Sequence, residues 1–167
     1  GDIWRGRHHP LMSAYSPRRY SYLQENNKMW TDDFIGSCPF HGDCIEGLIG
    51  VSALEERTKM KFDLIPKNDV KLWDLVAYYI ASLCVTVSGM IAPSRIVLGG
   101  RVVCEKTDLI FATELVQRVR GHFYDMIEAK DPIFREEYKE RHKESNEFYS
   151  PRYSELLNED EFICLPT

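Results

Sequence analysis

The chain has 167 residues, of which 44% are apolar and 28% charged, and this composition of one ordinary globular domain excludes collagen-like, low-complexity and wholly disordered proteins. Its formal net charge of −5 leaves no basic excess to neutralise phosphates, which argues against nucleic acid as the primary partner. The sequence has five cysteines, an odd number, and no secretory signal precedes them, so we expect no disulfide framework. We therefore expect a reducing intracellular compartment, either the cytoplasm or an organelle matrix.

Composition divides the chain into three segments. Residues 1–37 carry arginines and aromatic side chains but few periodic apolar positions, so we expect an irregular segment with the composition of a protein interface. Residues 38–130 contain a Cys/His loop and an α/β core. Residues 131–167 begin with an acidic stretch, which favours a solvated helix and loop, and end in a short apolar strand at 161–166.

Apolar residues recur at helical spacing over residues 70–92. The pattern predicts a long helix that is capped by Asn68 or Asp69 and ends before Pro93. Residues 75–92 are uncharged and just long enough to cross a bilayer. Because the second face of this helix is partly polar, we predict a buried helix of a globular protein and no membrane span.

A short strand is predicted at residues 95–98, where it is closed by the turn Gly99-Gly100. A second amphipathic helix is predicted at 107–130, with Thr107 as its cap. Together with the strand near the carboxy terminus, these elements predict one right-handed, parallel β-α-β unit. No other segment of the sequence has a convincing strand pattern.

Cys38, His41 and Cys44 follow one another at intervals of three residues, with Pro and Gly between them. Two thiols and an imidazole at this spacing can fold one tight loop around a tetrahedral Zn²⁺. The same pattern fits two free cysteines beside a surface histidine, and the spacing alone leaves both interpretations open. Three ligands also leave the fourth position of a closed zinc site to another group.

The segment 38–47, Cys-Pro-Phe-His-Gly-Asp-Cys-Ile-Glu-Gly, resembles the corresponding element of the ROK sugar kinases, above all the bacterial fructokinases. Residues 1–10 and 70–100 are also similar, and the resemblance covers about residues 1–130. It implies an α/β fold, the incomplete carboxy-terminal half of an actin-like, ribonuclease H-like kinase, rich in helices with few strands.

The resemblance also implies roles for individual residues. It favours a structural zinc ion bound by Cys38, His41 and Cys44. It matches Glu46 to a residue that contacts sugar hydroxyls, and it places Gly99 and Gly100 in the turn that approaches the nucleotide.

The chain departs from the family pattern at three informative positions. Where the family has His-Pro-Glu-x-Gly-His, this chain has the sequence His-Pro-Leu-Met-Ser-Ala at residues 9–14. Leu11 cannot accept a hydrogen bond from a sugar hydroxyl. Ala14 replaces the fourth zinc ligand, which leaves water, His8 or His9 for that position.

Arg101 replaces the third glycine of the nucleotide turn. The phosphate loop and general base of the family belong to an amino-terminal half that we do not find in this sequence. We therefore expect no catalytic residue here, and a pseudoenzyme with a structural or assembly role in a larger protein complex. The alternative is one chain of a split or fragmentary ATP-dependent fructokinase or hexose kinase. Cys84 and Cys104 have apolar neighbours and are expected to be inert core thiols.

Overall fold

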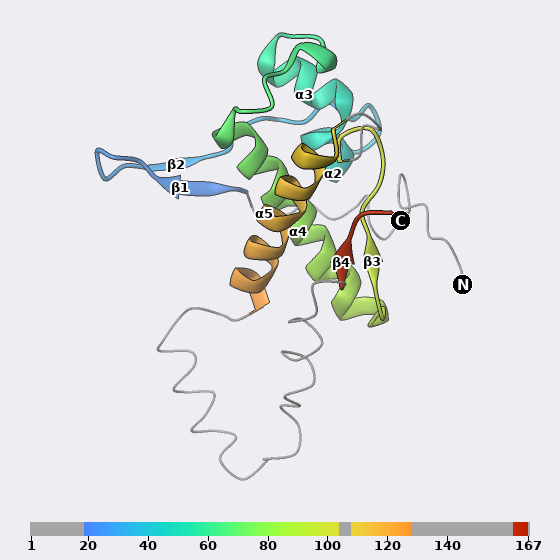
Figure 1. Ribbon diagram of the computed structural model, residues 1–167. Coiled ribbons are helices and arrows are strands. Elements are labelled where there is room, and N and C mark those ends of the chain that lie inside the picture. The colour runs from blue at the N-terminus through green and yellow to red at the C-terminus, as the bar shows by residue number, and fades with distance from the viewer. Residues whose placement is uncertain (1–18, 104–107, 128–161, 167) are drawn as a thin grey trace. The chain divides into compact units, whose positions relative to one another are not determined.

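The computed structural model describes residues 19–103, 108–127 and 162–166 (Figure 1). Contacts within the chain divide it into two compact units, residues 1–83 and 84–167. The sequence analysis divided the chain at other positions, into three segments by composition. The contacts that define these two units do not test that division. The helix and loop that we predicted before the last strand lie outside the described residues.

An antiparallel hairpin opens the described part of the first unit. Strand β1 (Ser21–Leu23) pairs with β2 (Met29–Thr31), and Tyr22 lies opposite Trp30 (Figure 1). The expectation of an irregular segment over residues 1–37, with no strand in it, is therefore wrong for this hairpin. Strands of three residues are too short to show the alternation by which a strand is recognised in a sequence.

Two short helices and a turn follow the Cys/His loop. Helix α2 (Ile45–Ile49) and helix α3 (Val51–Thr58) are separated by the extended backbone of Gly50, and the 3-10 turn η1 (Phe62–Leu64) packs against α3. The fully buried side chains of this unit are contributed by α2, α3 and the first half of the next helix. They include Leu48, Ala53, Leu54, Val76 and Tyr79.

Helix α4 (Val70–Ile91) begins at the predicted residue and ends one residue before the predicted end. Asp69 is the cap, because its Oδ1 accepts a hydrogen bond from the Leu72 N–H at 3.1 Å. By length and composition α4 could cross a membrane. Its inner face is nevertheless buried within the protein, as in the core helix of a globular fold, and we interpret it in that way. The fully buried residues on it include Val76, Ala77 and Ala81.

The second unit contains the predicted parallel strand pair. Strand β3 (Ile96–Val97) pairs in parallel with β4 (Ile163–Cys164), and Ile96 lies opposite Ile163. Helix α5 (Leu109–Ile127) lies between these strands in the sequence and packs against β4. The parallel β-α-β order is therefore confirmed.

The cap of α5 differs from the prediction by one residue. Asp108 caps the helix, because its Oδ1 accepts a hydrogen bond from the Phe111 N–H at 2.9 Å. Thr107, the cap we expected, lies outside the described residues. Near the middle of the helix, Arg120 Nε donates to the carbonyl oxygen of Ile163 at 2.9 Å and so fixes α5 to the strand.

Cys84 lies in α4 and is almost completely buried. Burial raises the pKa of its thiol to about 12, so the thiolate is not formed near neutral pH. The prediction of an inert core thiol is therefore confirmed for Cys84. Cys104 lies outside the described residues.

Candidate metal centre

The loop that carries the Cys/His motif is closed by a pair of backbone hydrogen bonds between Cys38 and Gly42. The N–H of Cys38 donates to the carbonyl oxygen of Gly42 at 3.2 Å, and the N–H of Gly42 donates back to Cys38 at 2.9 Å. Gly36 and Gly42 have positive φ angles of 91° and 61°. A Cβ atom on Gly36 or Gly47 would lie 2.2 or 1.9 Å from the Gly42 oxygen. The turn therefore closes only because these positions lack side chains.

This turn brings the three predicted metal ligands together. The Sγ atoms of Cys38 and Cys44 and a ring nitrogen of His41 all lie within 4.8 Å of one another. Cys38 Sγ is 3.8 Å from His41 Nδ1. In a tetrahedral site with Zn–S bonds of about 2.3 Å, neighbouring ligand atoms are about 3.5–4 Å apart. A small closure of the loop would complete three corners of such a site, and the thiolate and imidazole donors suit zinc.

The two thiols of the loop lie in different surroundings. Cys44 is buried at the N-cap of α2, where its Sγ accepts a hydrogen bond from the Gly47 N–H at 3.4 Å. Burial raises the pKa of Cys44. The backbone N–H groups of Phe40 and His41 lower the pKa of Cys38. The Cys38 thiol therefore loses its proton to form the metal-binding thiolate more readily than an ordinary cysteine, and the Cys44 thiol is held at the start of a helix.

The candidate fourth ligands, His8 and His9, lie outside the described residues, so the fourth position stays a prediction. Glu46 lies in the first turn of α2, beside the metal loop, and its Oε2 atom is buried. Gly99 and Gly100 follow β3 in the second unit, and Gly100 has a φ of 98° that favours glycine. The proposed contacts of Glu46 with a sugar and of these glycines with a nucleotide are likewise untested predictions.

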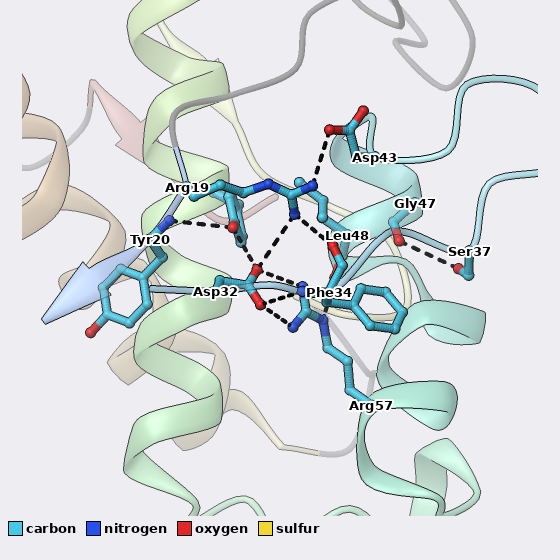
Figure 2. Close-up of polar contacts among 10 residues, drawn as sticks. Arg19, Tyr20, Asp32, Phe34, Ser37, Asp43, Gly47, Leu48 and Arg57 are labelled. Atoms are coloured by element: carbon cyan, nitrogen blue, oxygen red, sulfur yellow. Dashed lines mark hydrogen bonds and ion pairs between the residues drawn. The ribbon is translucent and has the colours of Figure 1, made fainter. Parts of the chain in front are cut away.

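A buried carboxylate beside the metal loop was not anticipated from the sequence. Asp32, directly after β2, is 3% exposed and accepts hydrogen bonds from both terminal nitrogens of Arg57 at 2.8 Å (Figure 2). The hydroxyl of Tyr79 donates a further bond at 2.6 Å. Burial alone would raise the pKa of Asp32, but the bonds from Arg57 and Tyr79 hold the pKa below its ordinary value. We call these three residues the Asp32 cluster.

The Asp32 cluster joins several elements of the first unit. Arg57 Nε donates to the carbonyl oxygen of Leu48 at 2.9 Å, which links α3 to the end of α2. The guanidinium also lies 4.1 Å from the ring centroid of Phe34. Tyr79 contributes the link to α4. Arg57 and Tyr79 are 25 and 47 residues away from Asp32 in the sequence, so no local pattern could identify this cluster.

Comparisons with known proteins give a consistent result. A protein-family model described as "ROK family" matches residues 17–143. The fructokinase of Lactococcus lactis subsp. cremoris is 43% identical over 77 residues, which are 46% of this chain and 26% of the relative. The fructokinase of Streptococcus mutans serotype c is 35% identical over 100 residues, 60% of this chain and 31% of the relative.

A Bacillus subtilis (strain 168) relative is 32% identical over 134 residues, 80% of this chain and 41% of its own length. The chain thus spans less than half the length of these curated relatives.

Proposed function

Because this chain belongs to the ROK family, we propose that its Cys/His loop binds a structural zinc ion within an actin-like fold, and that its role is structural rather than catalytic. The observation that carries the proposal is the approach of the Cys38, His41 and Cys44 ligand atoms to within 4.8 Å of one another. The ion would supply folding energy here, as structural zinc ions do.

The position of the ligands explains how a metal would stabilise this fold. Cys38 and His41 lie in the glycine turn, whereas Cys44 caps α2. An ion held by all three would cross-link the turn to the start of the helix. That cross-link would hold α2 in the position where its Leu48 carbonyl oxygen accepts the bond from Arg57 of the Asp32 cluster.

Zinc analysis tests this site directly. We expect the purified full chain to contain about one zinc ion per molecule, and Cys44→Ala to lose the ion and to unfold at a lower temperature, because a structural zinc site contributes folding energy. Elemental analysis and thermal unfolding with and without a chelator measure both effects. Cys164→Ala, which removes a thiol outside the loop, is the matched control and should retain the zinc. A wild-type chain without stoichiometric zinc contradicts the proposal.

The non-catalytic role is supported by residues that this chain has in place of family residues. Leu11 stands where the family has a sugar-binding Glu, and a site built for that contact then lacks a hydrogen-bond acceptor. Arg101 puts a bulky cation after the Gly100 turn, where the family approaches the nucleotide with glycine. Glu46, with its buried Oε2, supports the second candidate function, that of one chain of a split ATP-dependent hexose kinase.

An activity measurement separates these two functions. With ATP, Mg²⁺ and fructose, we expect the purified chain to show no phosphorylation above background in a coupled assay, because an apolar residue replaces the sugar-binding Glu. Turnover by this chain that is lost in Glu46→Gln contradicts the non-catalytic role. Turnover that appears only when a second chain supplies the Asp-x-Gly-Gly-Thr phosphate loop supports the split kinase.

The partner and the compartment are also part of the proposal. A protein partner is supported by large apolar side chains that are exposed on the described surface, such as Phe40 on the metal loop and Ile110 on α5. A reducing intracellular compartment is supported by the unpaired state of the described cysteines, which are Cys38, Cys44, Cys84 and Cys164.

A further inference from the structure

Arg19 connects the two ends of the metal loop. Its Nη1 donates to the carbonyl oxygen of Phe34 at 2.7 Å, and its Nη2 donates to Asp43 Oδ2 at 3.0 Å (Figure 2). Phe34 precedes the loop, and Asp43 directly precedes the ligand Cys44. One planar guanidinium therefore bridges the segment that contains Cys38 and His41, and it ends at the residue next to Cys44.

Arg19 is itself held by the rigid part of the first unit. Its Nη1 lies 3.9 Å from Asp32 Oδ2, so the guanidinium is placed between Asp43 and the Asp32 cluster (Figure 2). The N–H of the next residue, Tyr20, donates to the Tyr79 hydroxyl at 3.3 Å, which fixes the backbone beside Arg19 to α4. The base of the metal loop is thereby attached to the buried core.

We infer that Arg19 is a positioning residue for the metal loop, which it holds closed through Phe34 and Asp43 before the ion binds. The inference rests on the proposed zinc site. A loop whose ends are already joined loses less conformational entropy when its ligands are ordered around a metal. Binding should therefore be tighter with the Arg19 bonds than without them.

Electrostatics alone predicts the opposite effect. A guanidinium near a cation site repels the cation, so removing the charge of Arg19 would by itself strengthen metal binding. Weaker binding without Arg19 can then be attributed to the loss of loop closure. In Arg19→Met, the direction of the change in affinity therefore distinguishes the two effects.

The experiment measures zinc affinity in the full chain by competition with a chromophoric chelator, together with the visible absorption spectrum after Co²⁺ is bound. We expect Arg19→Met and Asp43→Ala each to weaken zinc binding about tenfold, the lower end of what outer-shell substitutions cost. The double variant should bind zinc no more weakly than Arg19→Met, because that variant already lacks the bond to Asp43. The Co²⁺ spectrum of each variant should change, since the ligand geometry is less fixed.

Lys61→Met is the matched control. It also removes a cation from an ion pair, with Glu55 at 3.9 Å, but the Lys61 side chain is 80% exposed and the pair lies outside the loop. Zinc affinity should be unchanged in this variant. Arg19→Lys should bind less tightly than the wild type, because an ammonium cannot span Phe34 and Asp43 as a guanidinium does.

The outcomes separate this inference from the proposed function. A wild-type chain that binds no zinc overturns both. Wild-type affinity, or tighter binding, in Arg19→Met or in Asp43→Ala overturns the positioning role alone. If Arg19→Met does not fold, Arg19→Lys provides the answer, because it keeps the positive charge and loses the bridge from Phe34 to Asp43.

Discussion

Replacement of Arg57 by Met is expected to lower the free energy of unfolding by about 3–5 kcal/mol, the cost of removing one partner of a buried ion pair. Asp32 would remain buried with its charge and would keep the hydrogen bonds from Tyr79 and Phe34, with the Arg19 guanidinium no closer than 3.9 Å. The bond from Arg57 to Leu48, which holds the end of α2, would also be lost. In the wild type the Asp32 side chain is 1% exposed and the Arg57 side chain 10%. Ion pairs that are buried to this degree cost the most free energy when one partner is removed.

Urea unfolding of the wild type and Arg57→Met, followed by circular dichroism, measures the loss. Lys61→Met is again a suitable control, because the exposed pair of Lys61 with Glu55 should contribute less than about 1 kcal/mol. A loss below about 1 kcal/mol in Arg57→Met would show that water or another cation compensates Asp32. The account of the Asp32 cluster given above would then be wrong.

Gly47→Ala is expected to open the metal loop and to destabilise the chain by about 3 kcal/mol, the upper end of the cost of overpacking. The new Cβ would lie 1.9 Å from the Gly42 oxygen and 2.9 Å from the Cys38 Cβ. Since the first of these atoms is backbone, the turn itself must move. Both the unfolding free energy and the zinc content should fall, as urea unfolding and elemental analysis can measure.

Gly121→Ala is the control for this substitution. Gly121 is exposed within α5, and a Cβ there would meet nothing within 4 Å. This change should leave the zinc content unchanged and stabilise the chain by about 0.5–1 kcal/mol, because alanine is the better helix former. Equal zinc content in the Gly47 and Gly121 variants would contradict the role assigned to the glycine turn.

The elements that could be predicted from the sequence are those with a long or strongly spaced local pattern. Helix α4 has more than five turns of periodic apolar residues and a proline after its end, so its type and its bounds follow from residues close together in the chain. The Cys38, His41 and Cys44 group could be predicted for a related reason. All its ligands lie within seven residues, and a turn alone brings them together.

The remaining features depend on contacts between distant residues. The hairpin of β1 and β2 is short, and Tyr20 beside it is buried by packing against Tyr78 of α4 with ring centroids 5.1 Å apart. Residue composition suggested an exposed interface segment there, because it cannot show which helix will cover an aromatic ring. The bond between Arg19 and Asp43 joins residues 24 positions apart, so the sequence pattern could not predict it either.

During synthesis on the ribosome, Asp32 meets its partners in a set order. Arg57 follows it by 25 residues, and Tyr79 by 47. At about 5–20 residues per second, the nascent chain therefore exposes the cation some seconds before it exposes the hydroxyl of α4. The carboxylate can be neutralised when α3 emerges, and α4 then packs onto an ion pair that is already formed. Burial of an uncompensated charge is avoided at each stage of growth.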